Sequence, residues 1–241
     1  MSVSVRPGSP TLCHVLREDP ELADAIPPER RQAAVQECVA REISLPAGGW
    51  HPSESVEGIG VLVLGGLIVH RVGIEGRQGA ELLGQGDLLR PGQREPESIT
   101  PLQVTTGWSV VDRARLAVLD DEFVPYVARY PELAAGLLAR AIQRSRNLLV
   151  NIAIVHQARV DVRLHMLLWH LAARWGRVRS DGTALPLRLT HNVLADLVAA
   201  RRPTVTSALS DLSRRGLVRF RDDTWVLSGD PPGALLDVAI G

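Results

Sequence analysis

The sequence predicts an α+β fold in which an antiparallel β-roll is followed by a long helix, then by two short helices and a β-hairpin. Three observations carry this prediction. Short apolar runs broken by glycine and proline fill residues 43–120, an apolar heptad repeat runs through residues 134–155, and residues 185–228 change from helical to alternating periodicity. The chain has 241 residues and is 45% hydrophobic, so it can build the cores of two domains.

Residues 11–42 are expected to be helical. Asp19-Pro20-Glu21 and Pro27-Pro28-Glu29 each place proline in the first turn of a helix, where its missing N–H costs nothing. The candidate strands that follow are residues 43–45, 60–64, 67–72, 80–83, 102–105, 109–112 and 116–119. Glycine or proline breakers such as Gly65-Gly66 separate them. Many short strands at this spacing predict an antiparallel roll or barrel.

Residues 123–176 are predicted to be helical. From Ala134 to Val155 the apolar positions recur at alternating spacings of four and three, which is typical of a helix paired with a second helix. We therefore expect a dimer seam that consists of Leu138, Ala141, Ser145, Leu148, Ile152 and Val155. The alternative is an ordinary helix packed on its own domain, because Leu137 and Leu149 widen the stripe.

Charge is unevenly distributed along the chain, although 27 basic and 27 acidic residues balance overall. Residues 159–221 hold twelve arginines against four acids, a net charge of +8. Residues 1–158 carry −4, and the tail from Asp222 carries a further −4. A basic segment joined to a mildly acidic one suits a module that faces a polyanion. A chance fluctuation of surface charge is the alternative.

Two short helices are predicted in the basic segment. Thr190 is a good N-cap for a helix over residues 191–198, and Ala199-Ala200 can make a tight turn. A second helix is expected over residues 203–214, because its apolar residues recur at spacings of four and three. Two such helices, the second with arginine and hydroxyl groups near its start, fit a helix-turn-helix.

Strand-like segments flank the two helices. Residues 185–189 are predicted to form a short strand before them. After Gly216, residues 217–221 and 224–227 alternate on either side of a turn at Asp222-Asp223. This pattern predicts a β-hairpin wing, which makes the segment a winged helix-turn-helix.

The residue types of this segment suit duplex DNA. Arginine can donate two parallel hydrogen bonds to guanine, and hydroxyl groups can bond base edges or phosphates. The expected base-reading residues are Arg202, Thr206 and Ser207. The expected backbone contacts are Thr190, Arg201, Thr204, Arg214 and Arg219. Each of these could instead be a solvated surface group.

Other chemistry finds little support. The cysteines, Cys13 and Cys38, cannot form a four-cysteine zinc or iron–sulfur site, and no metal site is expected. His165 and His170 are five residues apart, which misses the metalloprotease spacing, and there is no Walker loop, so no enzyme is predicted. No signal peptide is visible, and the longest apolar stretch, residues 58–69, is too short to span a bilayer. A cytoplasmic protein without a membrane partner is expected.

The last third of the chain resembles the winged helix of the Crp/Fnr family of bacterial transcription regulators. The resemblance lies in Leu194-Ala195-Asp196-Leu197-Val198, Arg201-Arg202-Pro203-Thr204-Val205-Thr206 and Gly216-Leu217-Val218. The order of the predicted parts also matches that family. The domains it implies are a cyclic-nucleotide-binding-like β-roll with N-terminal helices over residues 1–122, a dimerisation helix over 123–158 and a winged helix-turn-helix DNA-binding domain over 159–241.

The resemblance implies a sequence-specific transcription regulator that binds double-stranded DNA as a homodimer, with RNA polymerase as a further partner. Two positions depart from the family pattern. Pro203 stands where the family usually has an acidic residue, and Ser207 stands where an arginine is often found. We therefore expect a half-site sequence that differs from the usual one.

Residues 84–89 resemble the turn before the family's phosphate-binding cassette, but residues 90–96 lack the Gly-Glu pair that should follow. A cyclic phosphate needs backbone N–H donors and a buried arginine. Arg90 or Arg94 could supply the charge, and a cyclic nucleotide stays an alternative. The proline-broken segment favours a different effector, or none.

A second class of function stays open at this point. The chain could be a ligand-binding or protein-interaction module whose winged helix packs on a partner instead of DNA. An enzyme in the roll is a more distant third reading. Binding to DNA that weakens steeply with salt would distinguish the regulator from both.

Overall fold

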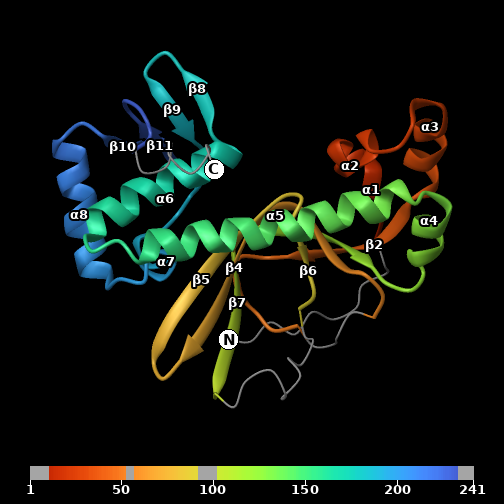
Figure 1. Ribbon diagram of the computed structural model, residues 1–241, viewed down its shortest axis with the longest axis horizontal. Coiled ribbons are helices and arrows are strands. Elements are labelled where there is room, and N and C mark those ends of the chain that lie inside the picture. The colour runs from red at the N-terminus through yellow and green to blue at the C-terminus, as the bar shows by residue number, and fades with distance from the viewer. Residues whose placement is uncertain (1–10, 53–56, 92–101, 233–241) are drawn as a thin grey trace. The chain divides into compact units, whose positions relative to one another are not determined.

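The computed structural model describes residues 11–52, 57–91 and 102–232 (Figure 1). The chain divides into two compact units. The first comprises residues 1–75 and 82–147, and the second comprises residues 76–81 and 148–241. Among the described residues, no helix is both long enough and apolar enough to cross a membrane.

The first unit begins with a strand and three short helices. These are β1 (Thr11–His14), α1 (Val15–Glu18), α2 (Pro20–Asp24) and α3 (Pro28–Glu37). The predicted helix starts are confirmed, and the Asp19 side chain caps α2 by accepting from the Leu22 N–H at 3.1 Å. The prediction that residues 11–42 are helical throughout is wrong at both ends. β1 pairs antiparallel with a strand that starts at Val39, so long-range pairing overrides local propensity there.

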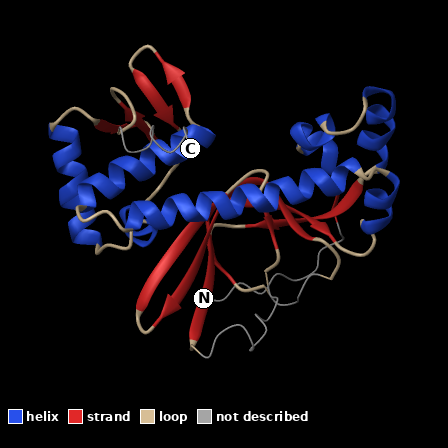
Figure 2. Ribbon diagram, viewed as in Figure 1, coloured by secondary structure: helices blue, strands red, loops and turns tan. Residues whose placement is uncertain are grey.

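An antiparallel sheet forms the body of the first unit, as predicted. Its further strands are β2 (Val39–Leu45), β3 (Gly48–Trp50), β4 (Gly60–Ile74), β5 (Arg77–Leu83), β6 (Leu88–Leu89) and β7 (Val104–Leu119). The strand order is β1-β2-β7-β4-β5, while β3 pairs with β7 and β6 pairs with β4. In Figure 2 the long strands β4 and β7 run side by side, and they form the central pair of the sheet.

Five of the seven predicted short strands are merged into two long ones, β4 and β7, while residues 43–45 and 80–83 lie in β2 and β5. Gly65-Gly66 does not break the chain but lies inside β4, where the pairing with β7 shifts register between Val63 and Ile68. Gly66 has φ +83°, and a Cβ at this position would overlap the Arg113 backbone. The glycine pair therefore allows a β-bulge and a close approach of β7, instead of the turn that its sequence suggests.

Two apolar cores stabilise the first unit. One lies under the N-terminal helices and includes the fully buried Leu16, Ile26 and Phe123. The other fills the inside of the roll with aliphatic side chains: Leu45, Val61, Val63, Ile68, Leu83, Leu89, Val110, Ala114 and Leu116.

The predicted helical region after the roll is confirmed, with breaks. It comprises α4 (Val124–Arg129), α5 (Glu132–Val155) and α6 (Val160–Trp175). α5 is the long helix, and its first part belongs to the first unit. There Arg140 forms ion pairs with Asp19 and Glu21, each at 2.9 Å, which attach the helix to α2.

The second unit contains the predicted winged helix-turn-helix. After α6 come β8 (Arg177–Arg179), β9 (Gly182–Leu185), α7 (His191–Leu197), α8 (Arg202–Arg214), β10 (Val218–Arg221) and β11 (Thr224–Leu227). The strand order is β10-β11-β9-β8. The predicted strand over 185–189 is wrong beyond its first residue. Pro186 has no N–H to donate to a ladder, and the strand extends towards residue 182 and pairs with β8 instead.

Candidate nucleic-acid interface

The two helices of the helix-turn-helix lie where the sequence places them. α7 begins after Thr190, whose side chain accepts from the Val193 N–H at 3.3 Å. Ala199 adopts φ +48° in the turn, and the Ala200 N–H donates to the Ala195 carbonyl at 2.9 Å. α8 starts at Arg202, one residue before the predicted start. The cap, the turn and the proline in the first turn thus fix both helix boundaries locally.

α8 presents one buried face and one exposed face. Its apolar residues Val205, Leu209 and Leu212 are buried. Its exposed residues include Arg202, Thr204, Thr206, Ser207 and Ser210. Burial of the apolar stripe therefore holds the arginine-and-hydroxyl face towards solvent, as a recognition helix requires.

The hydroxyl groups on this face already donate to their own helix. Thr206 Oγ1 donates to the Arg202 carbonyl at 3.1 Å, and Ser207 Oγ donates to the Pro203 carbonyl at 3.2 Å. Thr206 Oγ1 also lies 2.9 Å from His191 Nδ1 on α7. Each hydroxyl oxygen keeps acceptor capacity, so both side chains are suited to accept from an N–H group of a base edge.

The His191 contact joins the two helices at their exposed surface. Because His191 is the first residue of α7, the contact brings the predicted Thr190 close to the predicted Thr206. Arg201 is the exposed N-cap of α8, and Arg202 follows it. These residues share one end of the helix-turn-helix. His191 is a contributor that sequence reasoning missed, since its partner is 15 residues away.

Arg214 and Arg219 are placed differently from the other predicted backbone contacts. Arg214 lies at the opposite end of α8 from Arg202, about 18 Å along the helix axis, and pairs with Asp211 at 2.7 Å. Arg219 lies on β10 of the wing and donates to the Asp181 carbonyl at 3.3 Å. Both already use Nη2 for an intramolecular contact, so a phosphate would share the guanidinium with that partner.

Of the two predicted effector residues, only Arg90 lies in the described part of the chain. Arg90 is exposed and donates to the Gly58 carbonyl at 2.8 Å, while Arg94 lies outside the described residues. The described part of the roll interior is filled by aliphatic side chains.

The predicted dimer seam is only partly exposed in a single chain. Leu138, Ser145 and Ile152 are exposed, whereas Ala141, Leu148 and Val155 are half-buried. Ile142 and Leu149 are exposed instead, at 45% and 66%. The exposed line thus keeps the spacings of four and three, but it runs through residues 138, 142, 145, 149 and 152.

Charged residues that the sequence did not single out connect α6 to the helix-turn-helix. Asp161 forms ion pairs with Arg159 and Arg215, and the hydrogen bonds from Arg159 hold the pKa of Asp161 below its ordinary value. Arg163 donates to the Val198 carbonyl at 3.2 Å. No local pattern reveals the contacts of Arg215 and Arg163, because their partners lie 54 and 35 residues away in sequence.

His165 and His170 on α6 act as packing residues. His165 Nε2 accepts from Trp169 Nε1 at 3.1 Å, which makes the imidazole neutral with its proton on Nδ1. Burial lowers the pKa of both histidines.

Comparison with known proteins agrees with this geometry. Residues 162–231 match the family model of the Crp-like helix-turn-helix domain. The CRP-like cAMP-activated global transcriptional regulator from two strains of Mycobacterium tuberculosis is 28% identical over 153 residues. The match covers 62% of this chain and 62% of each relative, so it spans a little under two thirds of their length.

Solved structures share the fold. A CooA variant from Carboxydothermus hydrogenoformans has a TM-score of 0.60 at 16% identity, covering 93% of this chain and 94% of that one. FixK2 from Bradyrhizobium japonicum gives 0.56 at 16% identity, with 79% and 93% covered. The c-di-GMP-responsive regulator CLP from Xanthomonas campestris gives 0.52 at 21% identity, with 79% and 95% covered.

The second unit is therefore a winged helix-turn-helix of the Crp-like type. Beyond that domain, the chain is similar to a CRP-like transcriptional regulator, at 28% identity over 153 residues.

Proposed function

We propose that this protein is a sequence-specific, double-stranded-DNA-binding transcription regulator that acts as a homodimer. The observation that carries the proposal is the exposed face of α8, which the buried Val205, Leu209 and Leu212 hold towards solvent. That face combines an arginine with hydroxyl groups at the N-terminal end of the helix, the end that enters the major groove in a helix-turn-helix.

The proposed roles follow the positions along α8. Arg202 donates to guanine, and Thr206 and Ser207 accept from neighbouring base edges. Thr190, Arg201 and Thr204 at the same end contact the phosphates that flank those bases. Arg214 and Arg219 are farther away, and we propose for them weaker backbone contacts that compete with Asp211 and with the Asp181 carbonyl.

The proposed dimer pairs the α5 helices of two copies. Leu138, Ile142, Leu149 and Ile152 leave apolar surface in solvent along one line of a 24-residue helix. A second copy of the same line would cover it in a parallel coiled coil. In this arrangement residues 123–158 act as the dimerisation helix between a regulatory part, residues 1–122, and a DNA-binding part, residues 159–241.

Control by an effector is part of the proposal only in general terms. The curated relatives are cAMP-activated by name, and CLP is c-di-GMP-responsive by title. For this chain we assign no cyclic nucleotide, because residues 90–96 lack the expected Gly-Glu pair and Arg90 is exposed and donates to the Gly58 carbonyl. RNA polymerase stays a predicted partner of the DNA-bound form.

Selection from a pool of random duplex DNA tests the proposed function. The full chain should enrich a sequence with two related half-sites about one helical turn apart. In fluorescence anisotropy, that duplex should bind more tightly than a scrambled duplex of equal length, and log K should fall steeply with log salt, by roughly 0.9 per phosphate contacted. Failure to enrich any sequence, or a flat salt response, would favour the protein-interaction module instead.

A further inference from the structure

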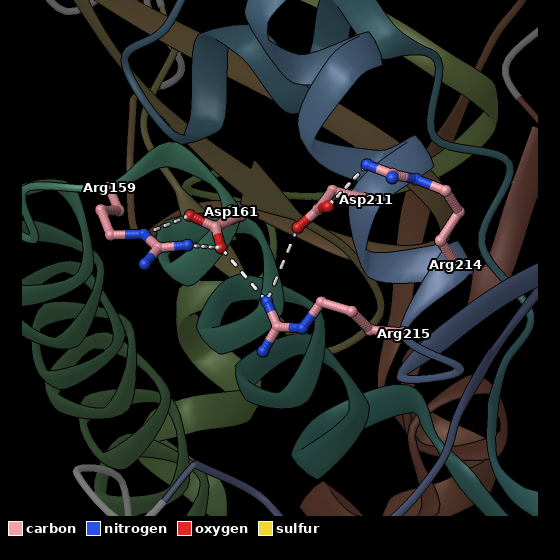
Figure 3. Close-up of polar contacts among 5 residues, drawn as sticks. All are labelled: Arg159, Asp161, Asp211, Arg214 and Arg215. Carbon is pink, nitrogen blue, oxygen red and sulfur yellow. Dashed lines mark hydrogen bonds and ion pairs between the residues drawn. The ribbon is translucent and has the colours of Figure 1, made fainter.

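A cluster of five charged side chains joins the first turn of α6 to the far end of the recognition helix (Figure 3). Asp161 lies in the first turn of α6, two residues after the N-cap Arg159. Asp211, Arg214 and the C-cap Arg215 belong to the last turns of α8. Asp161 and Arg215 are 54 residues apart in sequence, so their contact is a tertiary one.

The Asp161 carboxylate is the centre of this cluster. Arg159 donates to both of its oxygens, from Nε at 3.0 Å and from Nη2 at 2.7 Å. Arg215 Nη1 donates to Oδ2 of the same carboxylate at 3.3 Å. The Asp161 side chain is 12% exposed, compared with 50% for Arg215. A largely buried carboxylate gripped in bidentate fashion on one side has a fixed orientation, so it offers Arg215 a fixed partner.

α8 packs on α6, and the buried face of α8 includes Leu209 and Leu212. Polar contacts add direction to this packing, because a hydrogen bond depends on both distance and angle. The ion pair from Asp161 acts at the C-terminal end of α8, and Arg163 acts at the other end, through the Val198 and Ala199 carbonyls of the turn at 3.2 and 3.4 Å. One turn of α6 thus contacts the C-terminal end of α8 and the turn that precedes α8.

We propose that Asp161 is a positioning residue for DNA recognition, which sets the placement of α8 through Arg215. The inference rests on the proposed function, since it concerns how the helix reads a base sequence. It predicts that loss of the contact harms discrimination between sequences more than it harms the affinity for DNA in general.

The change in DNA affinity caused by Asp161→Asn distinguishes a positioning role from a simple effect of net charge. Asp161→Asn removes a negative charge from a basic unit and leaves Arg215 with only its longer ion pair to Asp211 on the same helix, at 3.7 Å (Figure 3). If Asp161 only reduced the positive charge of the unit, this substitution would tighten the binding of every DNA sequence. A positioning role predicts instead that the ratio of specific to non-specific affinity falls.

The experiment compares four forms of the full chain: the wild type, Asp161→Asn, Arg215→Gln and the double variant. Each is titrated into the duplex selected with the wild type and into its scrambled counterpart at one salt concentration. We expect each single variant to lower the affinity ratio by about three- to tenfold, a range that allows for solvent screening of the half-exposed pair. The double variant should lose no more than the larger single effect, because both changes break the same contact.

Arg214→Gln is the matched control. It removes a charge from the same turn of α8, but its partner Asp211 is on the same helix at i,i+3. It should weaken binding to both duplexes alike and leave the ratio unchanged. Thermal unfolding of every variant checks that it is folded. If Asp161→Asn does not fold, the affinity ratio of Arg215→Gln, a substitution at a half-exposed site, tests the proposal.

The outcomes are distinct. If the wild type prefers its selected duplex and the Asp161→Asn and Arg215→Gln variants keep that preference, or bind both duplexes more tightly, the positioning role is wrong and the proposed function stands. Additive effects in the double variant would also overturn the pairing. If the wild type shows no preference, the proposed function fails, and the positioning role fails with it.

Discussion

The dimer along α5 leads to a prediction whose magnitude follows from exposure. Leu149 and Ile152 are 66% and 54% exposed in a single chain. Full burial of such a side chain is worth about 2 kcal/mol, so covering what is exposed contributes a little over 1 kcal/mol for each. Two copies bring four of these side chains to the seam. The double substitution Leu149→Glu with Ile152→Glu should therefore cost about 5 kcal/mol, a roughly 10³- to 10⁴-fold weaker dimer.

Sedimentation equilibrium over a range of protein concentrations measures this effect. The wild type should sediment as a dimer and the double variant as a monomer. Gln143→Glu is the control, because it adds a carboxylate to an exposed position on the opposite side of α5 and should leave the dimer intact. A dimer that survives the double substitution would refute the seam. Dissociation by Leu148→Glu but not by Leu149→Glu would favour the heptad register predicted from sequence over the exposed line.

Three further predictions concern recognition, pH and thiol chemistry. Arg202→Ala should cost about 1–3 kcal/mol on the selected duplex and relax one base position in a repeated selection, and an equal loss on scrambled DNA would contradict base reading. Burial lowers the pKa of His165 and His170, so the unfolded chain binds their protons at higher pH than the folded chain does. The free energy of unfolding should therefore fall as pH drops through about 6.5 and level off below the folded pKa values. Urea midpoints at pH 7.5 and 5.5 test this. If the variant His165→Gln with His170→Gln shows the same difference between the two midpoints as the wild type, other groups cause the effect. Burial raises the pKa of Cys13 and Cys38 to about 11, so a thiol reagent at pH 8 should modify them readily only in denaturant; fast labelling of the native chain would contradict their burial.

The parts of the fold that the sequence predicts well are those with local signals. The helix-turn-helix boundaries agree within one residue because Thr190 caps one helix, Pro203 sits in the first turn of the next, and the apolar spacing of α8 is regular. The roll is predicted as a class but not as individual strands. Gly65-Gly66 resembles a turn, and only the pairing of β4 with β7 makes it a bulge.

The candidate site divides in the same way. The exposure of Arg202, Thr206 and Ser207 follows from helical periodicity alone. The partners Asp161 and Arg215 come together only because α6 packs on α8, and no local pattern encodes that crossing. The register of the dimer seam on α5 is predicted only in part. The heptad pattern shows that one stripe of the helix is apolar, but it does not show which edge of that wide stripe the rest of the chain covers.

Many of the arginines behind the net charge of +8 over residues 159–221 have intramolecular partners. Arg159, Arg214 and Arg215 are held by Asp161 and Asp211. Other arginines are engaged as well: Arg188 pairs with Asp223, while Arg163 and Arg219 donate to backbone carbonyls. By contrast, among the described residues, Arg201 and Arg202 have no intramolecular ion pair, and both are exposed at the start of α8.

Arg201 and Arg202 thus place two adjacent positive charges at the start of α8, where the macrodipole adds to them. Arg177, Arg179 and Arg221 are also exposed and form no ion pair among the described residues, but they lie on β8 and β10. The two charges at the start of α8 lie on the same helix end as the candidate base-reading residues. Electrostatic attraction to the phosphates and the geometry of base reading therefore converge on the same few side chains. For that reason, changes at Arg201 and Arg202 should alter DNA binding more than changes at the paired arginines of the same segment.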